Sequence, residues 1–115
     1  EKAYREGSYQ RGHECKCPQT EEPLRPDVIL FGEALPEKAL MKSFEASRQS
    51  DFFVVVGSSL MVSPANHCPM LAVQNGAKLV IINRDETALD QYAWKTIREP
   101  AADVLVEIEN RIHPV

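Results

Sequence analysis

Residues 52–59 read FFVVVGSS, and this stretch decides the fold. Its side chains from Phe52 to Val56 are aromatic or β-branched, with no polar residue between them. Such a continuous apolar run is typical of a strand that is buried on both faces. Gly57 ends the run, and two serines follow it. We therefore expect an interior strand with a polar loop at its carboxyl end.

Two further apolar runs predict strands before and after this one. Residues 28–31 (VILF) are ended by Gly32, and residues 79–82 (LVII) are ended by Asn83. Both runs are short and lack polar residues, as buried strands do. Residues 92–97 fit either a short strand or a turn. The sequence therefore predicts three buried strands, separated by segments long enough for crossover connections.

Three other segments have the spacing of helices. The first runs from Pro36 to near Arg48, the second from the start signal Ser63-Pro64 to Gly76, and the third closes the chain. The third is marked by the apolar residues Val104, Leu105, Ile108 and Ile112. Strands and helices that alternate in this way predict an α/β fold, a partial Rossmann-like parallel sheet with helices on both faces.

Composition excludes several classes of function. With 13 basic and 17 acidic residues the net charge is −4, and no basic block could follow a phosphate backbone, so nucleic acid is not expected as a direct partner. No apolar run approaches the roughly 20 residues of a membrane-spanning helix. Three cysteines make no disulfide framework, so we expect a reducing, cytoplasmic location, with Cys68 as a small buried side chain. Because the chain starts at Glu1 without Met or a signal peptide, we expect it to be cut from something longer.

The chain divides by composition into two domains. Residues 1–26 are rich in charge, glycine and proline and predict a loop-rich arm, whereas residues 27–115 carry the predicted strands and helices. In the arm, Cys15 and Cys17 are candidate zinc ligands, because thiolates suit tetrahedral zinc, and His13 is a third donor. A structural site needs four ligands, and this cysteine pair has an unusual spacing. Two free surface thiols therefore explain the pair at least as well.

Parallel sheets bind ligands beyond the carboxyl ends of their strands, and this rule selects three segments. Residues 57–59 offer a glycine that a ligand can approach and two hydroxyl groups for ribose or phosphate oxygens, although a plain connection is the commoner meaning of Gly-Ser-Ser. Residues 83–85 (Asn-Arg-Asp) can hold ribose hydroxyls or simply make a turn. Residues 31–33 could accept an extended peptide as an added strand.

These segments occur in one order at the spacing of a known family. The segments are LRPDVILFGE at residues 24–33, GSSLMVSP at 57–64, IIN at 81–83 and AADVL at 101–105. With them the chain resembles the carboxyl-terminal half of a sirtuin, the family of NAD-dependent protein-lysine deacylases. The second segment is similar to the family's Gly-Thr-Ser-Leu-x-Val-x-Pro stretch, and Ser58 keeps the hydroxyl of the threonine.

The resemblance implies three kinds of site. The residues implied to bind NAD are Gly57, Ser58 and Ser59 near the ribose and phosphates, Asn83, Arg84 and Asp85 at the adenosine ribose, and Ala101 against the adenine. Those implied to clamp an acyl-lysine peptide as a strand between two strands are Phe31, Gly32 and Glu33 on one side and Val62 on the other. The resemblance also makes residues 1–26 the remnant of a zinc module, with a partial zinc site at Cys15 and Cys17.

The resemblance also implies that catalytic parts are missing. In the family the acyl oxygen attacks the ribose carbon that bears nicotinamide, nicotinamide leaves, and the acyl group passes to ADP-ribose, with a histidine as general base. The family's Gly-Ala-Gly turn, Gln-Asn-x-Asp segment, catalytic His-Gly and first zinc cysteine pair are absent from this sequence, and His13, His67 and His113 have no matching flanks. We expect a deacetylase fragment that is inactive without the missing amino-terminal half.

Two other hypotheses stay open. Half a sheet leaves a strand edge and an apolar face uncovered, so the second hypothesis is a non-catalytic module that binds a nucleotide or a protein and forms a homo-oligomer. The third is a structural remnant that binds no ligand.

Overall fold

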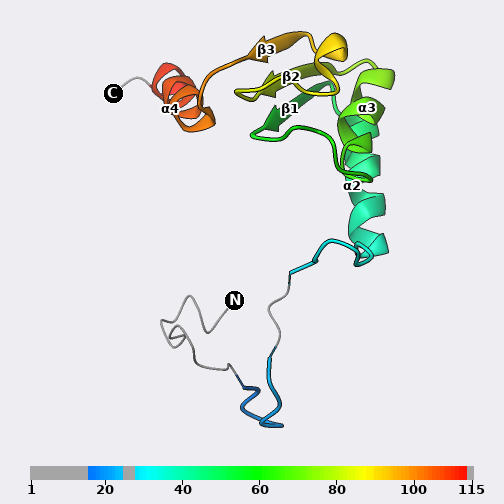
Figure 1. The fold of residues 1–115 in the computed structure, drawn as a ribbon. Helices are drawn as coiled ribbons and strands as arrows, with labels where there is room; N and C mark the ends of the chain where they lie inside the picture. The colour runs from blue at the N-terminus through cyan, green and yellow to red at the C-terminus, as the bar shows by residue number, and fades with distance from the viewer. Residues whose placement is uncertain (1–15, 25–27, 114–115) are drawn as a thin grey trace. The chain divides into compact units, whose positions relative to one another are not determined.

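The computed structural model describes residues 16–24 and 28–113 (Figure 1). The chain forms two compact units, Glu1–Leu35 and Pro36–Val115. The elements of the second unit are α2 (Glu37–Gln49), β1 (Phe52–Val56), α3 (His67–Gln74), β2 (Lys78–Ile82), the 3-10 helix η1 (Asp90–Tyr92), β3 (Lys95–Ile97) and α4 (Ala101–Ile112). The two units therefore meet between Leu35 and Pro36. The boundary predicted from composition, after residue 26, separates a zinc-module remnant from a nucleotide-binding domain, and it stays a prediction.

The three strands form a parallel sheet in the order β1-β2-β3. Val54 of β1 lies opposite Val80 of β2, and Val80 in turn lies opposite Lys95 of β3. The strands are connected through α3 and η1, so each link crosses from one end of the sheet to the other. The predicted α/β fold with a parallel sheet is confirmed.

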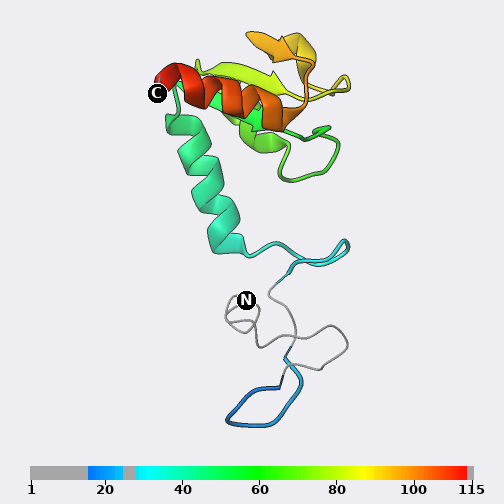
Figure 2. The same cartoon turned by 90° about the vertical axis from the view of Figure 1, so that its left-hand side faces the viewer.

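Helices cover the two faces of the sheet with different side chains. Because side chains alternate along a strand, Leu79 and Ile81 share one face of β2, and Val80 and Ile82 share the other. The first face packs with Val55 and Leu60 and against Val73 of α3, while the second packs against Val104 of α4. Figure 2 shows α4 lying across one side of the sheet, with α3 on the other. Helices on both faces were predicted, and the structure confirms them.

The predicted strand at residues 28–31 is wrong. Val28, Ile29 and Leu30 are exposed and irregular, and Phe31, 93% exposed, begins a turn. Within this segment the Glu33 N–H donates to the Leu30 carbonyl at 3.0 Å, and the Leu30 N–H donates to Glu33 Oε2 at 2.9 Å. The Leu30 and Glu33 N–H groups are therefore satisfied within this turn. An apolar run shows which side chains would favour burial, but it does not show whether another strand is present to pair with the run.

The interior position predicted for residues 52–56 is also wrong. In the part of the chain that the structure describes, β1 pairs with β2 alone and lies at an edge of the sheet, while β2 is the middle strand. On the face that α4 covers over β2, the β1 side chains Phe52, Val54 and Val56 are 51%, 43% and 41% exposed.

The second predicted helix starts later than the sequence predicted and ends where it predicted. The second helix begins at His67 rather than at Ser63, because residues 63–66 form turns in which the Ser63 hydroxyl donates to Asn66 Oδ1 at 3.0 Å instead of capping a backbone N–H. It ends before Gly76, whose φ of +92° needs a residue without a side chain, as predicted. Among the described residues, no helix is long and apolar enough to cross a membrane.

Candidate functional site

The carboxyl ends of the strands bring the predicted nucleotide segments to one edge of the sheet. The Gly57 N–H, just after β1, donates to the Ile82 carbonyl at 2.9 Å, so the first loop starts beside the end of β2. The Asn83 N–H, just after β2, donates to the Ile97 carbonyl at the end of β3 at 3.1 Å. Residues 57–59 and 83–85 therefore leave the sheet at neighbouring positions, which the sequence predicted.

The loop after β1 is open to a ligand at its start. Gly57 has a φ of +62°, a conformation that side chains rarely adopt, and a Cβ atom built there would meet nothing within 4 Å. Ser58 and Ser59 follow it with exposed side chains. The loop thus presents backbone and two hydroxyl groups to open space, and these groups can donate to or accept from ribose and phosphate oxygens.

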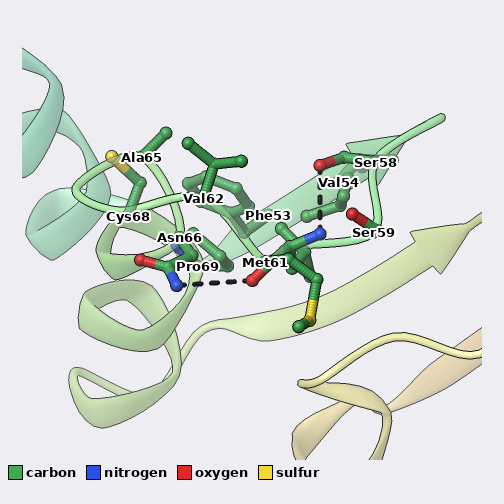
Figure 3. Close-up of a pocket in the computed structure, with 12 residues that line it drawn as sticks. Phe53, Val54, Ser58, Ser59, Met61, Val62, Ala65, Asn66, Cys68 and Pro69 are labelled. Atoms are coloured by element: carbon green, nitrogen blue, oxygen red, sulfur yellow. Dashed lines mark hydrogen bonds between the residues drawn. The ribbon is translucent and has the colours of Figure 1, made fainter. Parts of the chain in front are cut away.

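Leu60 anchors the same loop. It has a φ of +59°, unusual for a residue with a side chain, and yet it is only 7% exposed because its side chain packs beside Val55 in the core. Its N–H donates to Ser58 Oγ at 3.2 Å, and its carbonyl accepts from Asn66 Nδ2 at 3.3 Å (Figure 3). Both backbone groups and the side chain therefore hold the strained residue in place. The sequence analysis included Leu60 in the motif at residues 57–64 but gave it no role, and it did not name Asn66.

An open cavity of about 270 Å³ lies between β1, this loop and the start of α3. Its lining consists of Phe53, Val54, Val55, Ser58, Ser59, Leu60, Met61, Val62, Ala65, Asn66, Cys68 and Pro69. Three of the predicted site residues, Ser58, Ser59 and Val62, are among them. Cys68, expected in the core, is half-buried in this lining.

The loop after β2 is held by polar contacts. Asn83 Nδ2 donates to the Asp85 carbonyl at 2.9 Å. The Arg98 guanidinium donates from Nη1 to the same carbonyl at 2.9 Å and to the Asn83 carbonyl at 3.2 Å. The side chains of Arg84 and Asp85 are exposed. The predicted ribose-binding segment is therefore a turn held in place by hydrogen bonds from Asn83 and Arg98. This arrangement is compatible with both predictions for residues 83–85, a plain turn and a ligand site.

Asp90 completes the contacts of Arg98. The Asp90 carboxylate pairs with the Arg98 guanidinium and accepts from Thr87 twice, at 3.0 Å from its N–H and at 2.7 Å from its hydroxyl. The hydrogen bonds from Thr87, with a smaller effect of the Arg98 charge, lower the pKa of Asp90 below its ordinary value. The sequence reading missed Arg98 and Asp90. The available signal was the threonine three residues before the aspartate, a spacing typical of side-chain capping in a turn.

Ala101 lies at the start of α4, next to the end of the sheet. It is half-buried and packs with Val80, Ile82 and Val104. The N-terminus of a helix carries partial positive charge and unpaired N–H groups, which favour oxygen-rich ligands. Its proposed backbone contact with adenine stays a prediction.

The first unit contains the other predicted residues. Phe31, Gly32 and Glu33 form the exposed turn described above, and Val62 belongs to the second unit, so the peptide clamp stays a prediction. Cys17 lies in a loop closed by a bridge between Lys16 and Pro23.

The metal prediction concerns the same loop. Hydrogen bonds from the Gln19 backbone and from the Thr20 side chain and backbone lower the pKa of the Cys17 thiol, which favours the thiolate that binds metals. Cys15 and His13 lie outside the described residues. Within residues 16–24 and 28–113, no group of three or more His, Cys, Asp or Glu side chains could hold a metal ion. Within these ranges Cys17 therefore lacks the further ligands that a structural zinc site needs.

Comparison with known proteins gives consistent matches over most of the chain. Residues 1–64 match the Sir2 family. An NAD-dependent protein deacetylase 1 of Geobacillus kaustophilus is 49% identical over 102 residues, which are 88% of this chain and 41% of the relative. An NAD-dependent protein deacetylase of Oceanobacillus iheyensis is 57% identical over 76 residues, which are 66% of this chain and 32% of the relative.

The fold also matches a solved structure, that of Sir2 with a p53 peptide and NAD+. Its TM-score is 0.75 at 32% identity, and the match covers 85% of this chain and 41% of that chain. The present chain thus spans about two fifths or less of the length of the proteins that it matches.

Proposed function

Because this chain belongs to the Sir2 family, we propose that it forms part of the NAD site and of the peptide site of an NAD-dependent protein-lysine deacetylase. The observation that carries this proposal is the convergence of residues 57–59 and 83–85 at the carboxyl edge of a parallel sheet. In open parallel sheets this edge is where nucleotides bind. The names of the matched deacetylases support the choice of NAD among nucleotides.

The residues at this edge fit NAD. Gly57 leaves open space beside the backbone, as a close approach by a ribose or phosphate group requires. Ser58 and Ser59 supply hydroxyl groups, and Asn83 supplies an amide, which are the groups that hold ribose and phosphate oxygens. Ala101 brings the N-terminus of α4 toward the same edge. When bound, NAD supplies a ribose carbon that accepts the acyl oxygen and releases nicotinamide.

For the acyl-lysine substrate we propose a clamp made of residues 31–33 and Val62. Phe31 is 93% exposed and Val62 is 51% exposed, so both can contact a partner. An extended peptide can pair its backbone with such segments as an added strand. The p53 peptide of the matched Sir2 structure supports a peptide or protein as the substrate class.

We also propose that this chain alone does not turn over its substrates. His67 is the first residue of α3 and lies beside Phe44, with ring centroids 6.3 Å apart and the rings tilted, and His113 follows α4. Neither belongs to the loops at the carboxyl edge of the sheet, where a general base would have to reach the ribose hydroxyls.

The remaining part of the NAD pocket, the base and the other zinc ligands would come from the portion of the relatives that this chain does not span. Zinc at Cys15 and Cys17 and a cytoplasmic location remain part of this proposal.

A second candidate function is a non-catalytic, self-associating module. It is favoured by the edge position of β1 and by the exposure of Phe52, Val54 and Val56 on one of its faces. An open strand edge beside an apolar face can pair with another copy of the same chain. Light scattering over a concentration series separates the two: a mass that stays at 12.9 kDa excludes the homo-oligomer.

The main test is an assay of the chain with NAD and an acetyl-lysine peptide, followed by mass spectrometry for free lysine peptide and acyl-ADP-ribose. We expect no product from the chain alone and weak binding of ADP-ribose. Product from the chain alone would show that a base lies within these residues or comes from a second copy. Absence of any ADP-ribose binding at millimolar concentration would contradict the proposed nucleotide site.

A further inference from the structure

Asn83 is oriented by its neighbours in a way that leaves one atom for a ligand. Its side-chain atom at 2.9 Å from the Asp85 carbonyl must be Nδ2, because a carbonyl oxygen only accepts hydrogen bonds. Among the described residues, no hydrogen bond to Asn83 Oδ1 is present. Oδ1 is therefore an acceptor available to a hydroxyl group at the carboxyl edge of the sheet.

The orientation of Asn83 depends on where the Asp85 carbonyl lies. Arg98 Nη1 donates to this carbonyl at 2.9 Å and to the Asn83 carbonyl at 3.2 Å, so one nitrogen holds both ends of the turn. Arg98 directly follows β3, and the Asn83 N–H bonds to the last residue of that strand. The guanidinium thus reaches the turn from a segment that is itself tied to β2.

Asp90 fixes the guanidinium from the other side. It pairs with Arg98 Nη2, and its carboxylate is in turn held by the Thr87 N–H and hydroxyl. The Thr87 hydroxyl also accepts from the Leu89 N–H at 3.3 Å. The Arg98 guanidinium therefore joins the start of the 83–90 loop, at the Asn83 and Asp85 carbonyls, to its end at the Asp90 carboxylate.

From these contacts we propose that Arg98 is a positioning residue for the nucleotide site: it acts through the Asp85 carbonyl to hold Asn83 with Oδ1 presented to a ribose hydroxyl. This inference rests on the proposed function, in which Asn83 binds the ribose. It needs an arginine, because a planar guanidinium reaches two backbone carbonyls and a carboxylate at once, which the compact ammonium of lysine cannot do in the same geometry.

The test uses the full chain labelled with ¹⁵N, titrated with ADP-ribose and followed by the Asn83 side-chain amide signals. In the wild type we expect these signals to be dispersed without ligand and to move on titration. In Arg98→Met we expect them to shift toward those of a free amide before ligand is added. The affinity for ADP-ribose should fall about fivefold to tenfold, the effect of losing one well-placed hydrogen bond.

Two further variants separate positioning from charge and from stability. Arg98→Lys keeps the charge and should still lose most of the affinity. Arg48→Met removes the same charge from an exposed arginine of α2, paired only with Glu45 at 3.8 Å among the described residues, and should bind as the wild type does. If Arg98 only stabilised the fold, Arg98→Met would lower the urea midpoint without changing the affinity of the folded protein.

The outcomes distinguish the two proposals. A wild type that binds no ADP-ribose overturns the proposed function, and this inference with it. A wild type that binds, together with an Arg98→Met or Arg98→Lys variant that binds equally well with unmoved Asn83 signals, overturns the positioning role alone. If Arg98→Met does not fold, Arg98→Lys decides by the same readout.

Discussion

The loops after β1 and β2 leave the same edge of the sheet, but they are held by different kinds of interaction. The first is anchored by Leu60, an apolar side chain buried beside Val55 in the core. The second is held by Arg98 and Asp90, which are partly exposed and act through charged hydrogen bonds. Burial of apolar surface is not screened by salt and does not depend on the protonation of a side chain, whereas a partly exposed ion pair weakens as the salt concentration rises and as the pH falls toward the pKa of its carboxylate. The loop after β1 is therefore tied to the stability of the fold, and the loop after β2 can change while the core stays intact.

The largest effect is expected from the core below the first loop. Ile81 is fully buried in the cluster that contains Leu60, so Ile81→Ala removes apolar contacts and leaves a cavity. We expect the free energy of unfolding to fall by about 4 kcal/mol. Urea unfolding followed by circular dichroism measures this. Ile108→Ala, on α4 at 40% exposure, is the control and should lose much less.

The anchor itself comes next. Leu60→Ala keeps the requirement for a positive φ but removes most of the buried side chain, and we expect a loss of about 2–3 kcal/mol of unfolding free energy. The neighbouring Met61 is 72% exposed, so Met61→Ala should stay within about 0.5 kcal/mol of the wild type. Equal losses in the two variants would contradict the idea that Leu60 ties the loop to the core.

Gly57→Ala separates stability from ligand binding in the first loop. The new methyl group meets no protein atom within 4 Å, so the cost is the positive φ of 62°, about 1 kcal/mol. The methyl group would, however, occupy the space proposed for the ribose. We expect ADP-ribose binding to be lost while the protein still unfolds cooperatively, as calorimetric titration and urea unfolding can show together. Unchanged binding would place the ligand elsewhere.

The smallest effect concerns the second loop and depends on pH. Because hydrogen bonds from Thr87, and to a lesser extent the charge of Arg98, hold the folded-state pKa of Asp90 below its ordinary value of 3.8, ionised Asp90 stabilises the folded chain above that pH. This contribution is lost as the pH falls through the lower folded-state value. Asp90→Asn should remove it.

Thermal unfolding of the wild type and of Asp90→Asn between neutral and acid pH measures the difference. The gap between the two proteins should narrow with decreasing pH, and it should be smaller at high salt. The Leu60→Ala deficit should not narrow in parallel. A gap between wild type and Asp90→Asn that is constant over the whole pH range would show that the carboxylate charge does not brace the second loop.

The sequence predicted helices and strands correctly where a segment with the right local pattern also has a neighbouring element to pair with or pack against. The runs at 52–56 and 79–82 became β1 and most of β2, and the amphipathic pattern after residue 100 became α4. The run at 28–31 is equally free of polar residues, but it leads into a turn in which the Leu30 N–H donates to the Glu33 side chain. The difference lies in whether another strand is present to pair with it, and this is a long-range property.

The sequence by itself determined the α/β class, the parallel sheet and the polar segments 57–59 and 83–85 at its carboxyl edge, because strand periodicity, turn residues and chain order are local signals. The tertiary structure alone decided that β1 lies at an edge of the described sheet and that Leu60 is buried with a positive φ. It also decided that Arg98, distant in sequence, braces the turn at Asn83. Such contacts join residues that no local pattern connects, so they exist only once the strands have paired and the loops have met.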